Sequence, residues 1–484
     1  MRSILFIVLP LSAALARAEV LTFTNATGSG LWSNPANWQP TQLPGAEDDV
    51  IIPAGLVSRV DLPIIVRSVN ADGTLEIRNT LNIQEHSVFA GSATIAADIQ
   101  GSGNLIMLGV VRWNSGSLQG DGITFFADSS SLSINTTSPH RVERVLEIFG
   151  QCFVDHATLT ILRPQGLLRI GDSGHVRMIN ATIQSESADP GDTEAFVIAG
   201  LLEASEGTCS ITTPFINSGR LLSRASLTMN PGPVNIGPER RLSGGCWETA
   251  DAGTMSLPIA PLGLDGDATI KISGTGTSPS LYGSLRRIDG SIEVDTLLPA
   301  LVINSGAANR TEVSGRIRVT GDSLVSFSTG LNLADTALLE LQPSFERPCI
   351  TALNSVTAAV ALRGTLNIIA PSFIPDVCQE AIAIITGAGS ADSITGSLDT
   401  VLSPPFAPDQ PYYYTALAFE GPAVDAIASI NNSPADWDRN GSVDGDDTIA
   451  FFADWDANQG DINGDGGSDS DDVISYFTRF ENGC

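Results

Sequence analysis

The sequence predicts an all-β protein, a parallel β-helix (β-solenoid), that ends in a small α-helical module. Three observations carry this prediction. A short strand phrase returns through most of the chain, the same region lacks helical periodicity, and the C-terminus carries a duplicated acidic motif. Hydrophobic residues make up 42% of the 484 residues and charged residues only 16%. This composition is too apolar and too poor in charge for a disordered chain.

The returning phrase is a small residue followed by two aliphatic residues that are separated by one position. It recurs between Arg67 and Ile368, for example as GTLEI at 73–77 and GSIEV at 290–294. Alternation with period two indicates a strand that buries one face. In the C-terminal half the first aliphatic residue lies at 270, 292, 317, 339 and 366. Such steps suit one solenoid turn whose inward side chains stack on the next turn. An array of β-sandwiches is the alternative, because it also has short strands between turns.

The first residues have the pattern of an export signal. Met1-Arg2 precedes the apolar run Ile4–Leu15, and Ala16-Arg17-Ala18 offers a small-x-small cleavage site. We therefore expect residues 1–18 to be a signal peptide and the mature chain to be secreted, extracellular or at the cell surface. The apolar run is too short to span a bilayer core of about 30 Å, and we expect no transmembrane segment in the mature chain.

Residues 19–66 are predicted to form an N-terminal cap. Trp32 and Trp38 lie in a segment rich in proline and asparagine that leads into the apolar run Val50–Ile52. Such a segment can cover the first open layer of a sheet, and it resembles the start of many bacterial secreted β-helix proteins. A carbohydrate platform formed by the two indoles is the alternative interpretation.

Residues 67–430 are predicted to form the solenoid with its C-terminal cap, and residues 431–435 a linker. Trp113–Gly120 (WNSGSLQG) and Phe215–Gly219 (FINSG) are similar to the W-x-S-G-x-x-x-G and F-x-N-x-G repeats of large bacterial secreted proteins. The resemblance covers about 105–221 and implies a parallel β-helix, a class that is mostly without assigned activity.

The segment 436–484 carries two copies of an acidic loop, the second 25 residues after the first. Each loop has oxygen-bearing side chains at positions 1, 3, 5, 9 and 12 and a glycine at position 6. Ca²⁺ requires six to eight oxygen ligands, including the backbone carbonyl of position 7, on a sharply turned backbone. We therefore predict two Ca²⁺ ions. The predicted ligands are Asp436, Asp438, Asn440, Ser442, Asp444 and Asp447 in the first loop and Asp461, Asn463, Asp465, Gly467, Asp469 and Asp472 in the second.

Each loop runs into a segment with helical spacing of apolar residues, which include Ile449 and Phe452 in the first copy and Ile474 and Phe477 in the second. This spacing predicts that the two apolar faces pack on each other. Position 12 is aspartate, where an EF-hand has a bidentate glutamate, and one helix follows each loop. The duplicate resembles a type I dockerin module, which implies two Ca²⁺ ions and a cohesin-like or surface-anchoring partner.

The cohesin-contact positions differ from the common dockerin pattern. They hold Gly445-Asp446 and Ser470-Asp471 instead of a Ser/Thr-type pair. An acidic solvated tail is the alternative interpretation of the whole segment.

The charge balance and the cysteines limit the partners and the disulfides that can be expected. The chain has 54 acidic and 25 basic residues, of which only Lys271 is a lysine, and this balance argues against nucleic acid as a partner. In an oxidising compartment Cys209–Cys246 and Cys349–Cys378 could form disulfides, with buried free thiols as the alternative.

No residue pattern identifies a catalytic site. Gly171–Gly174 (GDSG) matches a serine-protease tetrapeptide but lies inside the repeats, and the four histidines are scattered. We predict a secreted non-catalytic β-helix protein whose calcium-binding tail acts in surface attachment, adhesion or extracellular assembly. The alternative is an extracellular carbohydrate-active enzyme, a polysaccharide lyase or hydrolase, that is docked through the tail. A groove lined by aligned carboxylates would favour the enzyme.

Overall fold

The computed structural model describes most of the chain from residue 18 to residue 481. The described residues are 18–186, 195–276, 278–296, 301–304, 310–321, 323–342, 350–352, 360–369, 382–388, 394–396, 400–402, 414–420, 425–432, 435, 437–438, 443–462 and 466–481. The predicted signal peptide, apart from Ala18, lies outside them. The chain divides into two compact units, which are residues 1–177 with 181–189 (unit 1) and residues 178–180 with 190–484 (unit 2).

Unit 1 is built from short strands and one 3₁₀ turn, η1 (Pro35–Asn37). Its strands are β1 (Val20–Phe23), β2 (Trp38–Gln39), β3 (Asp49–Ile52), β4 (Val57–Val60), β5 (Ile64–Val66), β6 (Ser68–Ala71), β7 (Thr74–Ile77), β8 (Leu81–Ile83), β9 (Ser87–Phe89), β10 (Ala93–Ile95), β11 (Ile99–Gln100), β12 (Leu105–Met107), β13 (Val110–Trp113), β14 (Gly116–Phe126), β15 (Ser131–Ile134), β16 (His140–Ile148), β17 (Gln151–Asp155), β18 (Thr158–Ile161), β19 (Leu167–Ile170) and β21 (Thr182–Ser185), with β20 (His175–Ile179) ending in unit 2.

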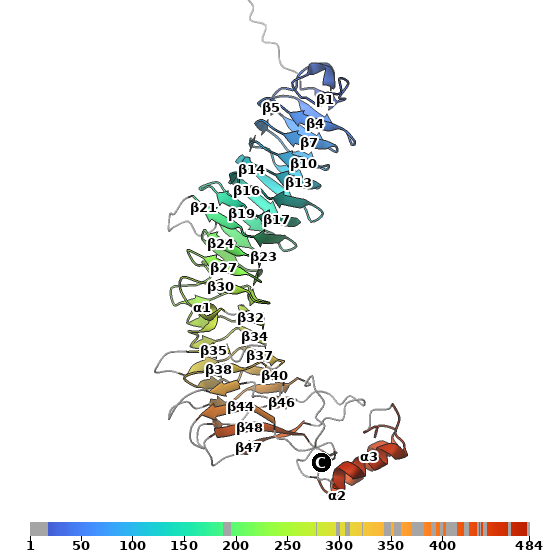
Figure 1. The fold of residues 1–484 in the computed structure, drawn as a ribbon, viewed down its shortest axis with the longest axis vertical. Coiled ribbons are helices and arrows are strands. Elements are labelled where there is room, and N and C mark those ends of the chain that lie inside the picture. The colour runs from blue at the N-terminus through green and yellow to red at the C-terminus, as the bar shows by residue number, and fades with distance from the viewer. Residues whose placement is uncertain are drawn as a thin grey trace, which may run out of the picture. The chain divides into compact units, whose positions relative to one another are not determined.

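Apart from β2, which pairs antiparallel with β1, the strands of unit 1 stack in parallel, one solenoid turn on the next. Strand β7 pairs with β4 on one side and β10 on the other, and β10 pairs with β13 (Figure 1). The register aligns Ile77, Ile95 and Trp113, which are all fully buried. Because inward side chains of one turn lie directly on those of the next, the repeats form one continuous core. The predicted parallel β-helix is confirmed.

The two N-terminal tryptophans are part of this core. Trp32 and Trp38 are buried, and their rings meet edge to face with centroids 5.1 Å apart. The Trp38 Nε1 donates to the Trp32 carbonyl oxygen at 3.0 Å. Neither indole therefore presents a face on the surface, which is contrary to a carbohydrate platform.

Unit 2 continues with the same kind of short strand and adds a helical turn, α1 (Pro279–Tyr282). Its strands are β22 (Phe196–Ile198), β23 (Leu201–Glu206), β24 (Thr208–Thr212), β25 (Phe215–Asn217), β26 (Arg220–Ser223), β27 (Ser226–Met229), β28 (Arg241–Leu242), β29 (Cys246–Thr249), β30 (Thr254–Ser256), β31 (Gly263–Leu264), β32 (Thr269–Gly274), β33 (Arg287–Ile288), β34 (Ser291–Thr296), β35 (Leu301–Ile303), β36 (Thr311–Val313), β37 (Arg316–Thr320), β38 (Val325–Phe327), β39 (Leu331–Leu333), β40 (Leu338–Leu341), β41 (Ile350–Ala352), β42 (Val360–Leu362), β43 (Thr365–Ile368), β44 (Ile382–Ala388), β45 (Ile394–Gly396), β46 (Thr400–Leu402), β47 (Tyr414–Glu420) and β48 (Asp425–Asn432).

The sequence phrase becomes one aligned column of side chains in unit 2. Its first aliphatic positions pair in register through β32, β34, β37, β40 and β43, and all five are fully buried. The column consists of Ile270, Ile292, Ile317, Leu339 and Leu366. The small residue that precedes the two aliphatic residues of each phrase lies where neighbouring solenoid turns stack closely. A Cβ on Gly315, for example, would lie 2.1 Å from the Gly290 carbonyl oxygen.

The C-terminal part of unit 2 departs from the parallel pattern. Strand β48 pairs antiparallel with β44 and with β47. Two helices follow, α2 (Gly445–Asp456) and α3 (Ser470–Glu481) (Figure 1). Among the described residues, no helix has the length and hydropathy needed to span a bilayer.

Candidate calcium centre

The structure describes seven of the twelve predicted calcium ligands. These seven are Asp438, Asp444, Asp447, Asp461, Gly467, Asp469 and Asp472. The other five, which are Asp436, Asn440, Ser442, Asn463 and Asp465, lie outside the described residues. Asp447 and Asp472, the last residue of each loop, are fully buried, and Asp461 is 8% exposed.

Both helices begin with the same pair of aspartates. Asp444 is the N-cap of α2, and its Oδ1 accepts the Asp446 N–H at 2.9 Å while Asp447 Oδ2 accepts the Asp444 N–H at 2.8 Å. These reciprocal bonds form a capping box. The second copy repeats them 25 residues later, from Asp471 N–H to Asp469 Oδ1 and from Asp469 N–H to Asp472 Oδ2, both at 2.8 Å. The helix starts are therefore fixed by residues that the loops also require.

The buried aspartate of each copy also closes its loop. Asp447 Oδ1 accepts the Asp438 N–H at 2.9 Å, and Asp472 Oδ1 accepts the Ile462 N–H at 3.0 Å. Each carboxylate thus joins the beginning of its loop to the first turn of the helix. The second loop is also curled at Gly466, whose φ is +97° and whose N–H donates to Asp461 Oδ2 at 2.8 Å. Glycine is favoured there because other residues are strained at positive φ.

The donor set fits Ca²⁺. It offers carboxylate, amide, hydroxyl and carbonyl oxygens, which are the hard ligands that this ion binds, and neither nitrogen nor sulfur. Asp447 is buried and, within the described part of the chain, forms no ion pair with arginine or lysine. Its oxygens accept backbone N–H groups but have no cationic partner among the described residues, and a bound cation would offset the cost of burying the charge.

The described residues hold only part of each loop. Among them, no three His, Cys, Asp or Glu side chains gather into a metal-binding group. What they supply is the closing carboxylate and the helix cap of each loop.

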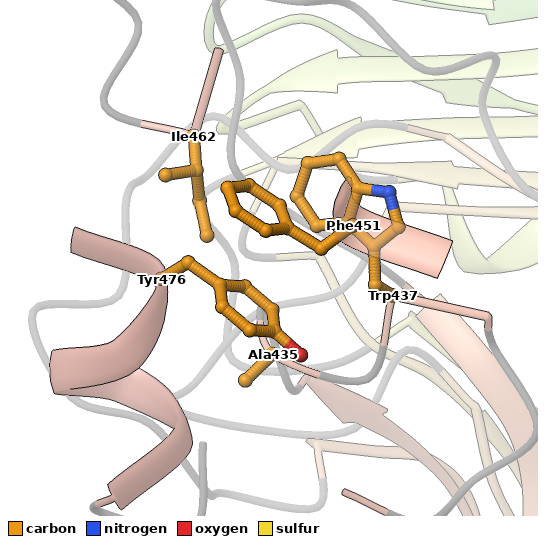
Figure 2. Packing of buried hydrophobic residues seen from close by; sticks show 5 residues of the cluster. All are labelled: Ala435, Trp437, Phe451, Ile462 and Tyr476. Carbon is orange, nitrogen blue, oxygen red and sulfur yellow. The ribbon is translucent and has the colours of Figure 1, made fainter. Parts of the chain in front are cut away.

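The aromatic core of this module reflects the duplication. Trp437 and Ile462 occupy the second position of their loops, and Phe451 and Tyr476 occupy equivalent places on α2 and α3. Figure 2 shows these four side chains together with Ala435. The Phe451 and Tyr476 rings are stacked, with centroids 4.1 Å apart, and Trp437 meets Phe451 edge to face at 5.0 Å. Because Trp437 and Ile462 of the loops belong to the same buried cluster as Phe451 and Tyr476 of the helices, loop geometry and helix packing are linked.

The acidic loops also influence this core electrostatically. Burial raises the pKa of the Tyr476 hydroxyl, a hydrogen bond with Thr448 lowers it, and the negative charges of Asp447, Asp438 and Asp444 raise it. The negative field of the first loop therefore reaches the stacked aromatic pair.

The helix faces differ in one respect from the sequence prediction. Ile449 and Ile474 were expected in the packed face, but they are 70% and 63% exposed. They occupy equivalent positions of the two copies, and Phe452 beside Ile449 is 36% exposed. Phe451 and Tyr476, two residues further along each helix, fill the core instead. Each helix therefore has an apolar residue left on the surface.

The cysteine pairing that the sequence allowed in the solenoid is not made. Cys246 is a free thiol, and the Cys209 thiol donates to the Glu206 carbonyl oxygen at 3.7 Å. Burial raises the pKa of Cys246 to about 11, and Glu248 adds to the rise. Cys349 and Cys378 lie outside the described residues.

Sequence reasoning missed a polar hollow on the outward face of unit 2. It is lined by Lys271, Glu293, Asp295, Arg318 and Thr320 and has a volume of about 190 Å³. The signal was in the repeat phrase itself, whose middle residue is Lys271, Glu293, Arg318 and then Glu340 in successive turns. That alternation of charge was visible in the sequence once the turns were aligned.

Comparison with known proteins gave no match to a family model, a curated protein or a solved structure.

Proposed function

We propose that this chain is a secreted, non-catalytic β-helix protein that a calcium-dependent C-terminal module attaches to a cell surface or an extracellular assembly. The observation that carries the proposal is the exposure of Ile449 and Ile474 at equivalent positions of two helices, each capped by a candidate calcium loop. A solvated acidic tail would have neither a shared aromatic core nor capped helices.

Calcium would act as the switch for this module. Asp447 and Asp472 would hold the ions together with the other predicted oxygen ligands of their loops. Trp437 and Ile462 connect the same loops to the core between the helices. Site formation and folding are then coupled, as in other small metal-binding domains. Removal of Ca²⁺ would disorganise the helices and with them the surface that carries the two isoleucines.

The exposed isoleucines suit a protein partner with an apolar surface. A contiguous exposed apolar patch often marks an interaction site, and Ile449 has the partly exposed Phe452 three residues further along α2. Burial of one isoleucine contributes about 1.5–3 kcal/mol. The resemblance to a dockerin favours a cohesin-like or surface-anchoring protein. Asp446 and Asp471 are exposed at the start of the helices, where they add charge beside the apolar residues.

The test is retention of the full chain at the surface of the producing cell, measured with and without a calcium chelator. Wild type should be retained in calcium and released by the chelator. The double variant Asp436→Ala with Asp461→Ala should be released in both conditions, since each substitution removes the first ligand of its loop.

A second variant separates calcium binding from docking. Ile449→Ser with Ile474→Ser should still bind two Ca²⁺ ions but lose retention, because both residues are exposed. Val302→Ser, at a 44% exposed valine of the solenoid, is the matched control and should be retained. Retention that persists in chelator and in both double variants would refute the proposal.

A further inference from the structure

The outward face of unit 2 carries a column of charged side chains with alternating sign. Five strands, β29, β32, β34, β37 and β40, pair in parallel with the middle positions of the phrase in register. Neighbouring members are one strand spacing apart, about 4.8 Å. The column consists of Glu248, Lys271, Glu293, Arg318 and Glu340.

The acidic members of the column are already paired by arginines outside it. Arg220 lies 2.6 Å from Glu248, and Arg316 lies 2.9 Å from Glu293 and also pairs with Glu340. Within the described residues, by contrast, Lys271 and Arg318 form no ion pair. The two cations of the column are therefore not neutralised by a direct contact.

These two cations flank the polar hollow. Lys271 and Arg318 are two strands apart, about 9.6 Å, on either side of Glu293, which is already paired with Arg316. Asp295 is exposed at the edge of the hollow, and Thr320 pairs in register with it on the next strand. The chain as a whole has a net charge of −29 and a single lysine. Two cations that form no ion pair within the described residues therefore line one concave site.

We infer that this hollow binds an acidic saccharide, with the carboxylate of one uronate unit held between Lys271 and Arg318. Asp295 can accept hydrogen bonds from sugar hydroxyls, and so can the Thr320 hydroxyl oxygen, whose hydrogen is donated to the Val294 carbonyl oxygen at 3.4 Å. The exposed Asp295 carboxylate opposes a densely charged anion such as phosphate. A neutral sugar would leave both cations without a direct ion pair. The ligand that satisfies all four side chains carries one carboxylate and several hydroxyls.

The volume of about 190 Å³ suits a single sugar ring. The hollow also lies on the outward face of a parallel sheet, so the polymer can extend over neighbouring turns. This inference concerns the solenoid and is independent of the calcium module.

The experiment is isothermal titration calorimetry of the full chain with a short oligogalacturonate, in the presence of a calcium chelator. The chelator removes calcium bridging between uronates, so failure of the calcium proposal leaves this test unaffected. Neutral cello-oligosaccharide and inorganic phosphate are titrated in parallel. Lys271→Gln and Arg318→Gln are each expected to weaken oligogalacturonate binding about tenfold, because each removes one charge-assisted contact.

The matched control is Arg112→Gln. Arg112 is an exposed arginine of β13 in unit 1, and it also forms no ion pair among the described residues. This variant should bind like wild type. Circular dichroism melting of each variant confirms folding, and if Lys271→Gln does not fold, Arg318→Gln decides.

Three results would overturn the inference. They are absence of oligogalacturonate binding by wild type, undiminished binding by a folded Lys271→Gln or Arg318→Gln variant, and equal or tighter binding of the neutral sugar or of phosphate.

Discussion

The Nε of Arg144 donates to the carbonyl oxygen of Gly122 at 2.7 Å from a side chain that is 1% exposed. The same guanidinium reaches the carbonyl oxygen of Gly103, one turn further away. It fills the space beside a register shift between Gln119 and Ile123, where β14 has more residues than its partner β16. Burial lowers the pKa of Arg144 to about 10, so the group still carries its charge at neutral pH.

Arg144→Met should destabilise unit 1 by about 3 kcal/mol, because it leaves buried carbonyl oxygens without a donor. Urea unfolding of the full chain, followed by circular dichroism, measures the change. Arg141→Met is the matched control on the same strand, since Arg141 is exposed and its ion pair with Glu186 contributes little. Equal stability of the two variants would show that the carbonyl contacts are unimportant.

Ile317→Asp should destabilise unit 2 by several kcal/mol, because an unpaired carboxylate would lie within the aligned core column. Thr269→Asp, on the outward face of β32 opposite Cys246 and Ser291, should change the free energy of unfolding by less than about 1 kcal/mol. Chemical unfolding followed by circular dichroism in the β-sheet region gives the free energy of unfolding of the two variants. Tolerance of aspartate at 317 would be incompatible with the aligned core.

Asp447→Ala should reduce the calcium stoichiometry of the full chain from two ions to one, because it removes the closing carboxylate of the first loop. Asp472→Ala should do the same for the second loop, and the double variant should bind none. Calorimetric titration with CaCl₂ gives the stoichiometry. Asp456→Ala is the control, since Asp456 is an exposed aspartate of α2 outside both loops. Two ions bound by the double variant would exclude these aspartates as ligands.

His140 should make stability fall as the pH is lowered. Its ring is fully buried, Nε2 bonds the Trp113 carbonyl oxygen at 2.9 Å, and Nδ1 has no partner. Burial lowers the pKa of His140 in the folded state below its ordinary value of 6.5. The unfolded chain therefore binds the proton more readily. Stability is fully present above the unfolded pKa and is lost as the pH falls from there towards the folded pKa.

The measurement is the free energy of unfolding between about pH 5.5 and pH 8, a window in which histidine titrates. His140→Gln should flatten the pH dependence. His86→Gln, at an exposed histidine, should leave it unchanged. A wild-type profile that is already flat, or that is unchanged in His140→Gln, would contradict this assignment.

The sequence predicted the regularly repeated strands of the solenoid more completely than its irregular features. Ile270, Ile292 and Ile317 could be placed in the core because strand periodicity and spacing agree over many turns. The bulge filled by Arg144 occurs once, so no repeating sequence pattern predicts it.

The C-terminal helices show a second kind of difficulty. Each has apolar residues on more than one face, and spacing alone does not tell which face is covered. Phe451 and Tyr476 are buried and Ile449 and Ile474 are exposed, because Trp437 and Ile462 from the loops fill the space beside the aromatic rings. That assignment depends on residues outside the helices.

The alternation of charge from Glu248 to Glu340 also affects which strands pair with each other as the solenoid folds. The inward column is nearly uniform, so a strand that joined the growing solenoid one turn out of place would bury its isoleucine or leucine equally well. On the outward face the same error would set Lys271 against Arg318 or Glu293 against Glu340, and like charges directly opposite each other destabilise a strand pair. The alternating column therefore disfavours pairing that is shifted by one turn, which the uniform hydrophobic column would allow.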